Sequence, residues 1–327
     1  MSDWILALAA PFATSVALIA VLRDSRWAVR LADHPNSRSL HEKPTPRLGG
    51  IAMMLAALPI AIALSDGALR WTWALGSCLA IISFADDVKS LPVTVRLAAH
   101  FTAAALAVAS YPVVNAHWQF VLIAFGVLGI AWMTNLYNFM DGADGFAGGM
   151  TLFGFAAYAA GAFQAEDHSL ALGCAAVSAS ALGFLLYNFP PARVFMGDAG
   201  SIPVGFLAGA IGTFGFAHGA WPAWFPVLVF SPFAVDATVT LMRRLARRDP
   251  IWIAHRSHLY QRLVLSGWTT RKLCMRGYAL MIAVAVSALA GRSAGASMQW
   301  VILGLWCAFY FVAMVAMDRR GASNSVT

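Results

Sequence analysis

Charge is scarce in this chain of 327 residues: only 11% of them are Asp, Glu, Lys or Arg, and 60% are hydrophobic. The hydrophobic residues gather in runs of about 17 to 20, the length that a helix needs to cross a bilayer. Short polar stretches separate these runs, and the mean hydropathy is +0.70. The pattern predicts an all-α, polytopic integral membrane protein.

Cysteines and targeting signals are also scarce. The four cysteines lie inside apolar runs without Cys-x-x-Cys spacing, so we expect neither a disulfide framework nor a zinc site. The first 22 residues lack a basic N-terminal region and a clear cleavage site, which predicts a retained first span. No lipidation motif is present. The cysteines are Cys78, Cys174, Cys274 and Cys307.

Eleven apolar runs are predicted to form transmembrane helices. They belong to a single transmembrane domain over residues 1–320, which precedes a short polar tail, GASNSVT, expected to be disordered at 321–327. The spans are expected over residues 4–22, 48–64, 71–85, 93–112, 118–134, 146–163, 169–188, 201–217, 221–241, 273–290 and 297–317.

Basic residues are nearly absent from one of the two sets of loops. If the spans alternate in direction, only Arg70 and Arg292 of the 22 Lys and Arg residues fall in that set. Because cytoplasmic loops carry the excess of basic residues, we expect the N-terminus outside and the C-terminus in the cytoplasm. The net charge of +7 follows from this asymmetry and suits anionic membrane lipids, so it requires no nucleic-acid partner.

The predicted topology brings four polar clusters to the cytoplasmic face. The opposite loops carry only scattered ionisable residues such as Asp66 and Glu166, which we interpret as solvated caps. Any chemistry is therefore expected in the cytoplasm. The clusters are Asp86 and Asp87 in FADDVKSLP, the segment NLYNFMDGADG at 135–145, Asp198 in VFMGDAGS, and His255 and His258 in AHRSHLYQRL.

Acidic residues in these clusters favour a site where a divalent cation meets a polyanion. Mg²⁺ takes oxygen ligands and commonly bridges one or two carboxylates to substrate phosphates. Basic side chains would hold the phosphate oxygens that the metal leaves uncovered. The acidic residues are Asp86, Asp87, Asp141, Asp144 and Asp198, and the basic candidates are Lys43, Arg47, Arg193, Arg256 and Arg262.

Each cluster also has a structural interpretation. Carboxylates at the end of a span are commonly solvated caps, and the amides of Asn135 and Asn138 would serve to cap a span and hold a loop. Histidines in an exposed loop, such as His255 and His258, need no function. The occurrence of all four clusters at one face is what favours a functional site.

Five ordered motifs resemble those of the polyprenyl-phosphate N-acetylhexosamine-1-phosphate transferases. This family, glycosyltransferase family 4, also includes the phospho-N-acetylmuramoyl-pentapeptide transferase of cell-wall synthesis. The resemblance runs through most of the chain, and the motifs are specific mainly in combination. They are HEKPTPRLGG at 41–50, FADDVKSLP, NLYNFMDGADGFAG, VFMGDAGS and AHRSHLYQRL.

The resemblance implies a Mg²⁺-dependent enzyme in which undecaprenyl phosphate attacks a UDP-N-acetylhexosamine and UMP leaves. By motif position, Asp198 is the first choice of magnesium ligand and Asp87 the second. Asp86 matches the residue proposed to deprotonate or orient the lipid phosphate. Because such a phosphate has a second pKa of about 6, positioning would matter more than proton removal. An aspartyl-phosphate intermediate stays open.

Substrate contacts also follow from the resemblance. Asp144 would lie near the uracil, Asp141 would line the nucleotide and metal pocket, and Lys43 would approach the diphosphate. Asn135 and Asn138 would donate and accept hydrogen bonds there. The further candidate contacts are Arg193, His255, Arg256, His258 and Arg262.

The last basic loop departs from part of the family, whose cell-wall members carry a His-x-His-His-like cluster. Here the sequence is His255-Arg256-Ser257-His258, which is more similar to transferases that initiate O-antigen synthesis. The departure leaves the donor open between UDP-N-acetylglucosamine and a 6-deoxy amino sugar.

Two other functions are the alternatives. A transporter or flippase of a lipid-linked glycan would place ionisable residues near mid-membrane, whereas the predicted spans are nearly free of charge at their centres. A membrane scaffold would not explain the clustered acids. Small residues in LAGAIGTFG and AAVSASALG favour close helix packing, which would serve either the bundle itself or a homodimer.

Overall fold

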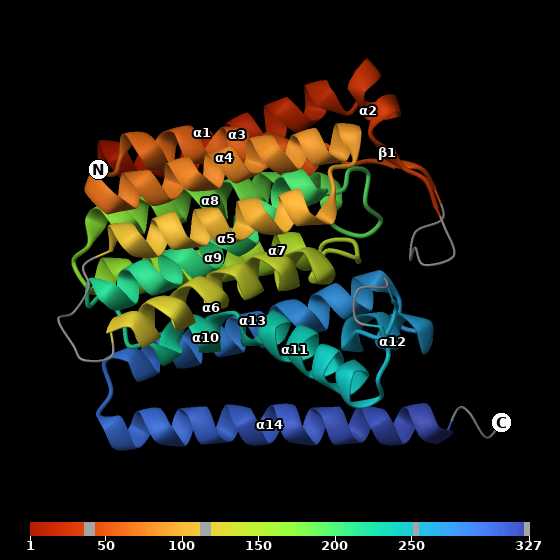
Figure 1. Cartoon of the computed structure of the whole chain (residues 1–327). Helices are drawn as coiled ribbons and strands as arrows, with labels where there is room; N and C mark the ends of the chain where they lie inside the picture. The colour runs from red at the N-terminus through yellow and green to blue at the C-terminus, as the bar shows by residue number, and fades with distance from the viewer. Residues whose placement is uncertain (36–42, 112–118, 251–254, 324–327) are drawn as a thin grey trace.

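Long helices dominate the computed structural model and lie side by side in one bundle (Figure 1). It describes residues 1–35, 43–111, 119–250 and 255–323; the start of the HEKPTPRLGG motif, residues 112 and 118 of the predicted spans and the tail after 323 lie outside them. The elements are α1 (Ser2–Leu22), α2 (Arg26–Arg30), β1 (Ala32–Asp33), β2 (Thr45–Pro46), α3 (Gly49–Ala63), α4 (Gly67–Lys89), α5 (Val93–Ser110), α6 (Gln119–Met140), α7 (Phe146–Gln164), α8 (His168–Asn188), α9 (Asp198–Ala217), α10 (Trp224–Val229), α11 (Ser231–Ala246), α12 (Leu259–Leu265), α13 (Thr270–Arg292) and α14 (Ala296–Ser323).

The all-α membrane fold is confirmed. Within the described ranges, strand is confined to β1 and β2, which pair antiparallel with Ala32 opposite Pro46. Nine of the described helices are long and apolar enough to cross a membrane: α1, α4 to α9, α13 and α14. Helix α3 is apolar but shorter. The predicted number of eleven spans is therefore not confirmed, although every predicted span that the structure describes is largely helical. Helix α14 also extends to Ser323, into the predicted tail.

One predicted span is wrong as a continuous helix. Residues 221–241 fold as two helices, because α10 ends at Val229 and α11 begins at Ser231. The break follows from Pro232, which has no N–H to donate to the carbonyl of Leu228 four residues earlier. Helix α11 then runs to Ala246, beyond the predicted end, and leaves the direction of the bundle axis (Figure 1).

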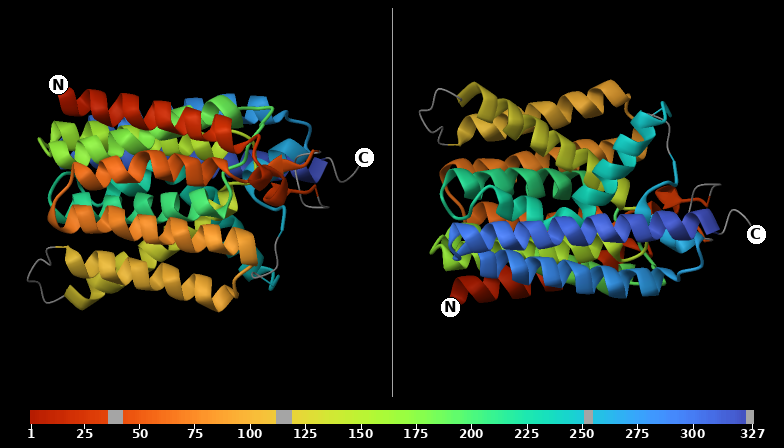
Figure 2. Two further views of the ribbon diagram at one scale, coloured as in Figure 1. Left: turned by 90° about the horizontal axis from the view of Figure 1, so that it is seen from above. Right: turned by 90° about the horizontal axis from the view of Figure 1, so that it is seen from below.

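The polar clusters of the sequence meet at one end of the bundle, as predicted. This end, which we call the basic end, carries α2, β1, β2 and α12, together with the segments 141–145 and 189–197 (Figures 1 and 2). Helix α1 starts at the opposite end (Figure 1). There Arg70 pairs with Asp66 at 2.8 Å and Arg292 donates to the Ala220 carbonyl.

Helices α8 and α9 form the centre of the bundle, whereas no residue in the apolar window of α14 is buried. Glycines allow the central helices to approach closely. A Cβ added at Gly205 would lie 2.8 Å from the Met133 carbonyl oxygen, and one at Gly209 would lie 3.0 Å from Ile130 Cα. Of the glycines in LAGAIGTFG, Gly209 thus packs against α6, whereas Gly212 packs against Tyr158 and Pro226 and Gly215 against Trp221, all within this chain.

Candidate active site at the basic end

The N-terminus of α9 is held against α3 by two glycines. A Cβ added at Gly50 would lie only 2.4 Å from Gly200 Cα, so no larger side chain fits between the two backbones. The Gly50 amide donates to the Met196 carbonyl at 2.9 Å. Gly197 has a φ of +70°, which turns the chain into α9. These contacts fix the position of Asp198, the first residue of α9.

Asp87 and Asp198 meet at this helix N-terminus. The Asp87 carboxylate, on the last turn of α4, accepts a hydrogen bond from the Ala199 amide at 3.1 Å. A helix N-terminus attracts negative charge, because its first amides have no partner within the helix. Asn138 interacts with the Asp198 carboxylate and accepts from Ser201 Oγ at 2.9 Å. Asn138 and Asp198 are thus brought together as the sequence predicts.

Asp86 has different partners from its neighbour, as expected for adjacent residues on a helix. Its side chain is buried and accepts from the Leu91 amide at 2.6 Å. Arg96 Nη1 lies 3.3 Å from Asp86 Oδ2 and 4.0 Å from Asp198 Oδ2. One guanidinium therefore links two of the predicted catalytic carboxylates.

Arg96 was not among the site residues predicted from the sequence. It lies in the first turn of α5, where the helix dipole disfavours a positive charge. A basic residue at such a position needs compensating carboxylates, and the nearby Asp86 and Asp87 supply candidates. This unfavourable placement is the signal that would have identified it.

Asp141 completes an acidic cluster in the segment between α6 and α7. Burial raises the pKa of its carboxyl well above the ordinary value, and the charges of Asp198 and Asp87 raise it further. The Arg47 guanidinium, which is paired with Asp33, acts in the opposite direction. The three carboxylates therefore repel one another, and a bound cation would relieve that repulsion.

The rest of the NLYNFMDGADG segment is held by hydrogen bonds to neighbouring elements. Asp144 Oδ2 accepts from the Ala192 amide at 2.9 Å, and the Gly145 amide donates to Asn188 Oδ1 at 2.9 Å. Asn135 donates to the Ala131 carbonyl of its own helix at 2.7 Å. Asp144 thus positions the segment 189–197, and its contact with uracil stays a prediction.

Lys43 and Arg193 lie at the basic end outside this acidic cluster. Lys43 is exposed. The Arg193 guanidinium lies 5.2 Å from the centre of the Tyr187 ring and donates to the Leu186 carbonyl at 2.7 Å. Neither of these two Arg193 interactions involves a side chain of the acidic cluster. Substrate contact therefore stays a prediction for Lys43 and for Arg193.

The histidines and arginines of AHRSHLYQRL surround the start of α12. The buried His258 ring stacks on Tyr260, with its Nδ1 3.4 Å from Asp236 Oδ1, and the His255 ring is 4.9 Å from that of His258. Arg256 is exposed, whereas Arg262 pairs with Asp318 at 3.0 Å. Their predicted substrate contacts stay untested.

Tyr260 connects α12 to the acidic cluster. Its hydroxyl donates to the Phe139 carbonyl at 3.2 Å, and a Cβ added at Gly142 would lie 2.3 Å from the same hydroxyl oxygen. A glycine is therefore required at position 142 for α12 to pack beside Asp141.

Asp236 is a structural residue that the sequence alone did not identify. Its Oδ1 accepts from the Leu259 amide at 2.8 Å and its Oδ2 from the Tyr260 amide at 3.0 Å. The carboxylate, carried by α11, thus caps the N-terminus of α12 from outside that helix. Only its position inside the predicted span 221–241, a few residues after the break, distinguishes it in the sequence.

Asp236→Ala should lower the free energy of unfolding by about 0.5 to 2 kcal/mol, since it removes both acceptors of the α12 amides. Hydrogen exchange of the Leu259 and Tyr260 amides should accelerate at the same time. Asp249→Ala is the control, because it removes a more exposed carboxylate that follows the C-terminus of α11 and lies 3.9 Å from Arg244. Unchanged protection of both amides in Asp236→Ala would contradict the capping role.

A family comparison reaches the same region of the chain. A model described as glycosyl transferase family 4 matches residues 69–215, a range that contains Asp86, Asp87, Asp141 and Asp198. Over this range the chain is similar to that family. The match to the glycosyl transferase family 4 model ends at residue 215, before α12. The similarity of the His255 to Arg262 region to known transferases therefore depends on the longer pairwise comparisons.

Those similarities extend over most of the chain. It is 28% identical to the "Probable undecaprenyl-phosphate N-acetylglucosaminyl 1-phosphate transferase" of Bacillus subtilis (strain 168), over 82% of this chain and 80% of the relative. It is 28% identical to the "Undecaprenyl-phosphate alpha-N-acetylglucosaminyl 1-phosphate transferase" of Yersinia pestis, over 90% and 86%. It is 29% identical to the "Phospho-N-acetylmuramoyl-pentapeptide-transferase" of Moorella thermoacetica, over 79% and 87%.

The donor set of this acidic cluster fits a hard cation. Among the described residues, no group of three or more His, Cys, Asp or Glu side chains converges as an all-protein metal site. Magnesium does not require one, since it commonly uses one or two carboxylates and completes its shell with water and phosphate oxygens. Asp87 and Asp198, which repel each other and Asp141, supply such a pair.

Proposed function

We propose that this protein transfers an N-acetylhexosamine-1-phosphate from a UDP-amino sugar to undecaprenyl phosphate. A phosphate oxygen of the lipid forms a bond to the β phosphorus of the donor, the bond from that phosphorus to the bridging oxygen breaks, and UMP leaves. A lipid-linked sugar pyrophosphate remains. The observation that carries the proposal is the meeting of Asp87 and Asp198 at the N-terminus of α9, within the family match.

Mg²⁺ would be held by Asp198 and Asp87 and would neutralise charge on the diphosphate. Asp86 is oriented by the Leu91 amide and by Arg96, which suits a residue that positions the attacking lipid phosphate. Arg96 also approaches Asp198, so it would keep the two carboxylates in a fixed relation while the substrates bind.

The nucleotide would bind beside the segment 135–145. Asp144 would accept from the uracil imide, with Asn138 and Asp141 lining the same pocket and Lys43 near the diphosphate. The excess of basic residues in the loops at the basic end supports an orientation in which that end faces the cytoplasm of a bacterial inner membrane. The sequence His255-Arg256-Ser257-His258 supports a role in initiating O-antigen or a related surface polysaccharide.

Arg96→Gln should reduce kcat/KM by about 10- to 100-fold, because it leaves the buried Asp86 without its cation and frees Asp198 to move. Arg96→Lys, which keeps the charge, should recover part of the activity. The measurement is turnover of UDP-N-acetylglucosamine by purified, folded protein. Wild-type kcat/KM in Arg96→Gln would contradict the positioning role.

The function is tested by identifying the nucleotide that the purified protein releases from undecaprenyl phosphate, Mg²⁺ and one UDP-amino sugar at a time. UMP together with a lipid pyrophosphate is the expected product, and the most active donor identifies the sugar. UDP would instead mean that both phosphates stay with the nucleotide, which overturns the proposed reaction. Absence of release with every donor, in protein shown to be folded, would favour the transport alternative.

A further inference from the structure

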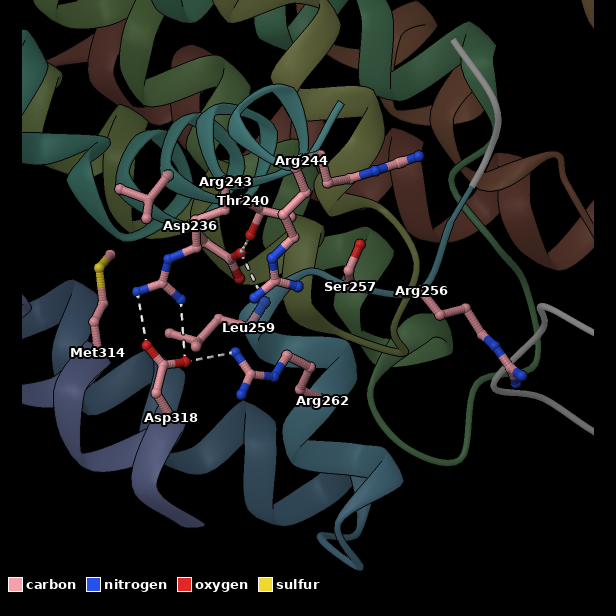
Figure 3. Close-up of a pocket in the computed structure, with 12 residues that line it drawn as sticks. Asp236, Thr240, Arg243, Arg244, Arg256, Ser257, Leu259, Arg262, Met314 and Asp318 are labelled. Atoms are coloured by element: carbon pink, nitrogen blue, oxygen red, sulfur yellow. Dashed lines mark hydrogen bonds and ion pairs between the residues drawn. The ribbon is translucent and has the colours of Figure 1, made fainter. Parts of the chain in front are cut away.

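A pocket lined by arginines lies between α11, α12 and α14 at the basic end, apart from the acidic cluster (Figure 3). Its volume is about 630 Å³, within the usual range for small-molecule sites. The remainder of the lining is apolar except for Thr240 and Ser257, so the pocket is amphipathic. The charged lining residues are Arg243, Arg244, Arg247, Arg256, Arg262, Asp236 and Asp318, and the apolar ones are Val239, Leu259 and Met314.

Positive charge is in excess in this arginine pocket. Five guanidinium groups line it with two carboxylates, and a third carboxylate, Asp249, lies 3.9 Å from Arg244. The Asp236 carboxylate already accepts hydrogen bonds from two amides of α12. Within the described part of the chain, neither Arg247 nor Arg256 has a carboxylate partner, so the pocket is suited to an external anion.

The pocket already binds one oxyanion, which belongs to the protein itself. The Asp318 carboxylate pairs with both Nη atoms of Arg243, at 3.2 and 2.9 Å, and accepts a hydrogen bond from Arg262 Nη1 at 3.0 Å (Figure 3). A forked pair of this kind is the geometry in which arginine also binds phosphate. These ion pairs attach α14 to α11 and α12, but they do not explain the presence of Arg247 and Arg256.

The surroundings favour a lipid phosphate over a free one. Helix α11 exposes Met242 and Leu245, and α14 exposes Phe309 and Val312, all of them large apolar side chains. Acyl chains would cover such residues while the headgroup reaches the arginines at the membrane surface. Basic pockets between helices on the cytoplasmic side are suited to anionic headgroups.

We propose that the arginine pocket binds the phosphodiester headgroup of an anionic membrane lipid, at a site separate from the acidic cluster. Helix α12 separates the two sites: its Tyr260 amide bonds to Asp236 beside the pocket, while the Tyr260 hydroxyl bonds to Phe139 beside Asp141. In this proposal the lipid is not the acceptor substrate, and Arg256 and Arg262 bind its headgroup instead of making the substrate contacts that the resemblance implies. Its binding does not depend on the proposed reaction.

The test compares phosphatidylglycerol with phosphatidylcholine bound to the purified full chain, by native mass spectrometry and by lipid titration. Wild-type protein should retain phosphatidylglycerol preferentially. Arg247→Gln/Arg256→Gln should raise its apparent Kd by about tenfold or more, since two charged donors are lost. Asp318→Asn should not weaken binding, because it frees Arg243 and Arg262 for the phosphate.

The matched control is Arg26→Gln/Arg30→Gln, which removes the same charge from two exposed residues of α2 at the same end of the bundle. Thermal unfolding confirms that each variant is folded. Unchanged phosphatidylglycerol affinity in Arg247→Gln/Arg256→Gln would overturn the proposal, as would an equal loss in the control pair.

Two competition experiments distinguish a membrane-lipid phosphate from inorganic phosphate and from the phosphate of the acceptor substrate. Inorganic phosphate at millimolar concentration should not displace the lipid, since it lacks the acyl contacts; displacement would mean a simple anion site and would refute the lipid assignment. Undecaprenyl phosphate should bind without displacing phosphatidylglycerol. Stoichiometric exchange between the two lipids would show that the pocket belongs to the acceptor substrate.

Discussion

Replacing Asp198 by Asn should lower turnover by about 10³-fold, because the proposed site loses a carboxylate that opposes the charge of Mg²⁺ and diphosphate. The substitution preserves the shape of the side chain and the first turn of α9. Asn138 and Ser201 can still form their hydrogen bond, so the protein should remain folded. The measurement is the rate of UMP release at saturating donor and lipid, together with the dependence of that rate on Mg²⁺ concentration.

Asp24→Asn is the control for Asp198→Asn, since Asp24 is an exposed carboxylate at the basic end that pairs only with its neighbour Arg23 among the described residues. Its turnover should match that of the wild type. Retention of full Mg²⁺-dependent turnover by Asp198→Asn would remove this residue from the proposed metal site, even if the overall reaction were confirmed.

Gly50→Ala should destabilise the protein by about 1 to 3 kcal/mol or more and abolish most activity. The added Cβ would lie 2.4 Å from Gly200 Cα and 2.4 Å from the Met196 carbonyl oxygen, both of them backbone atoms. No change of side-chain rotamer relieves such a contact. The start of α9 must therefore move, and Asp198 moves with it. Thermal unfolding and UMP release measure the two effects.

Gly129→Ala provides the matched control for this substitution. Nothing lies within 4 Å of a Cβ added at Gly129, which is also inside a helix. Alanine there should be neutral or stabilise the protein by up to about 1 kcal/mol, because it has the higher helix propensity. If Gly50→Ala has the same unfolding temperature and the same rate of UMP release as Gly129→Ala, the close contact of α3 with α9 does not position the site.

The sequence was sufficient to predict most of the long helices and the end at which the polar clusters meet. Long apolar runs report membrane helices directly, and alternation of spans then brings Asp86 and Asp198 to one end. The different partners of Asp86 and Asp87 also follow from helical geometry alone. These features depend on local composition and on the order of elements.

Features that depend on contacts between distant elements were not predictable in the same way. The break between Val229 and Ser231 was missed because hydropathy alone does not register the absent amide of Pro232. The ion pair of Arg96 with Asp86 and the hydrogen bonds of Asp236 with α12 join separate elements. The relative positions of those elements could not be predicted from a single sequence. The placement of Asp141 beside other carboxylates likewise emerges only when α4, α6 and α9 are assembled.

The most direct test of the central claim follows the β phosphorus of the donor. Wild-type protein is incubated with undecaprenyl phosphate, Mg²⁺ and UDP-N-acetylglucosamine carrying a radioactive label at that phosphorus, and the lipid is then extracted. The account predicts that the label enters the lipid phase together with the sugar, leaves unlabelled UMP behind, and stays in the aqueous phase with Asp198→Asn. Transfer of the sugar while the label remains on the nucleotide would contradict phosphosugar transfer.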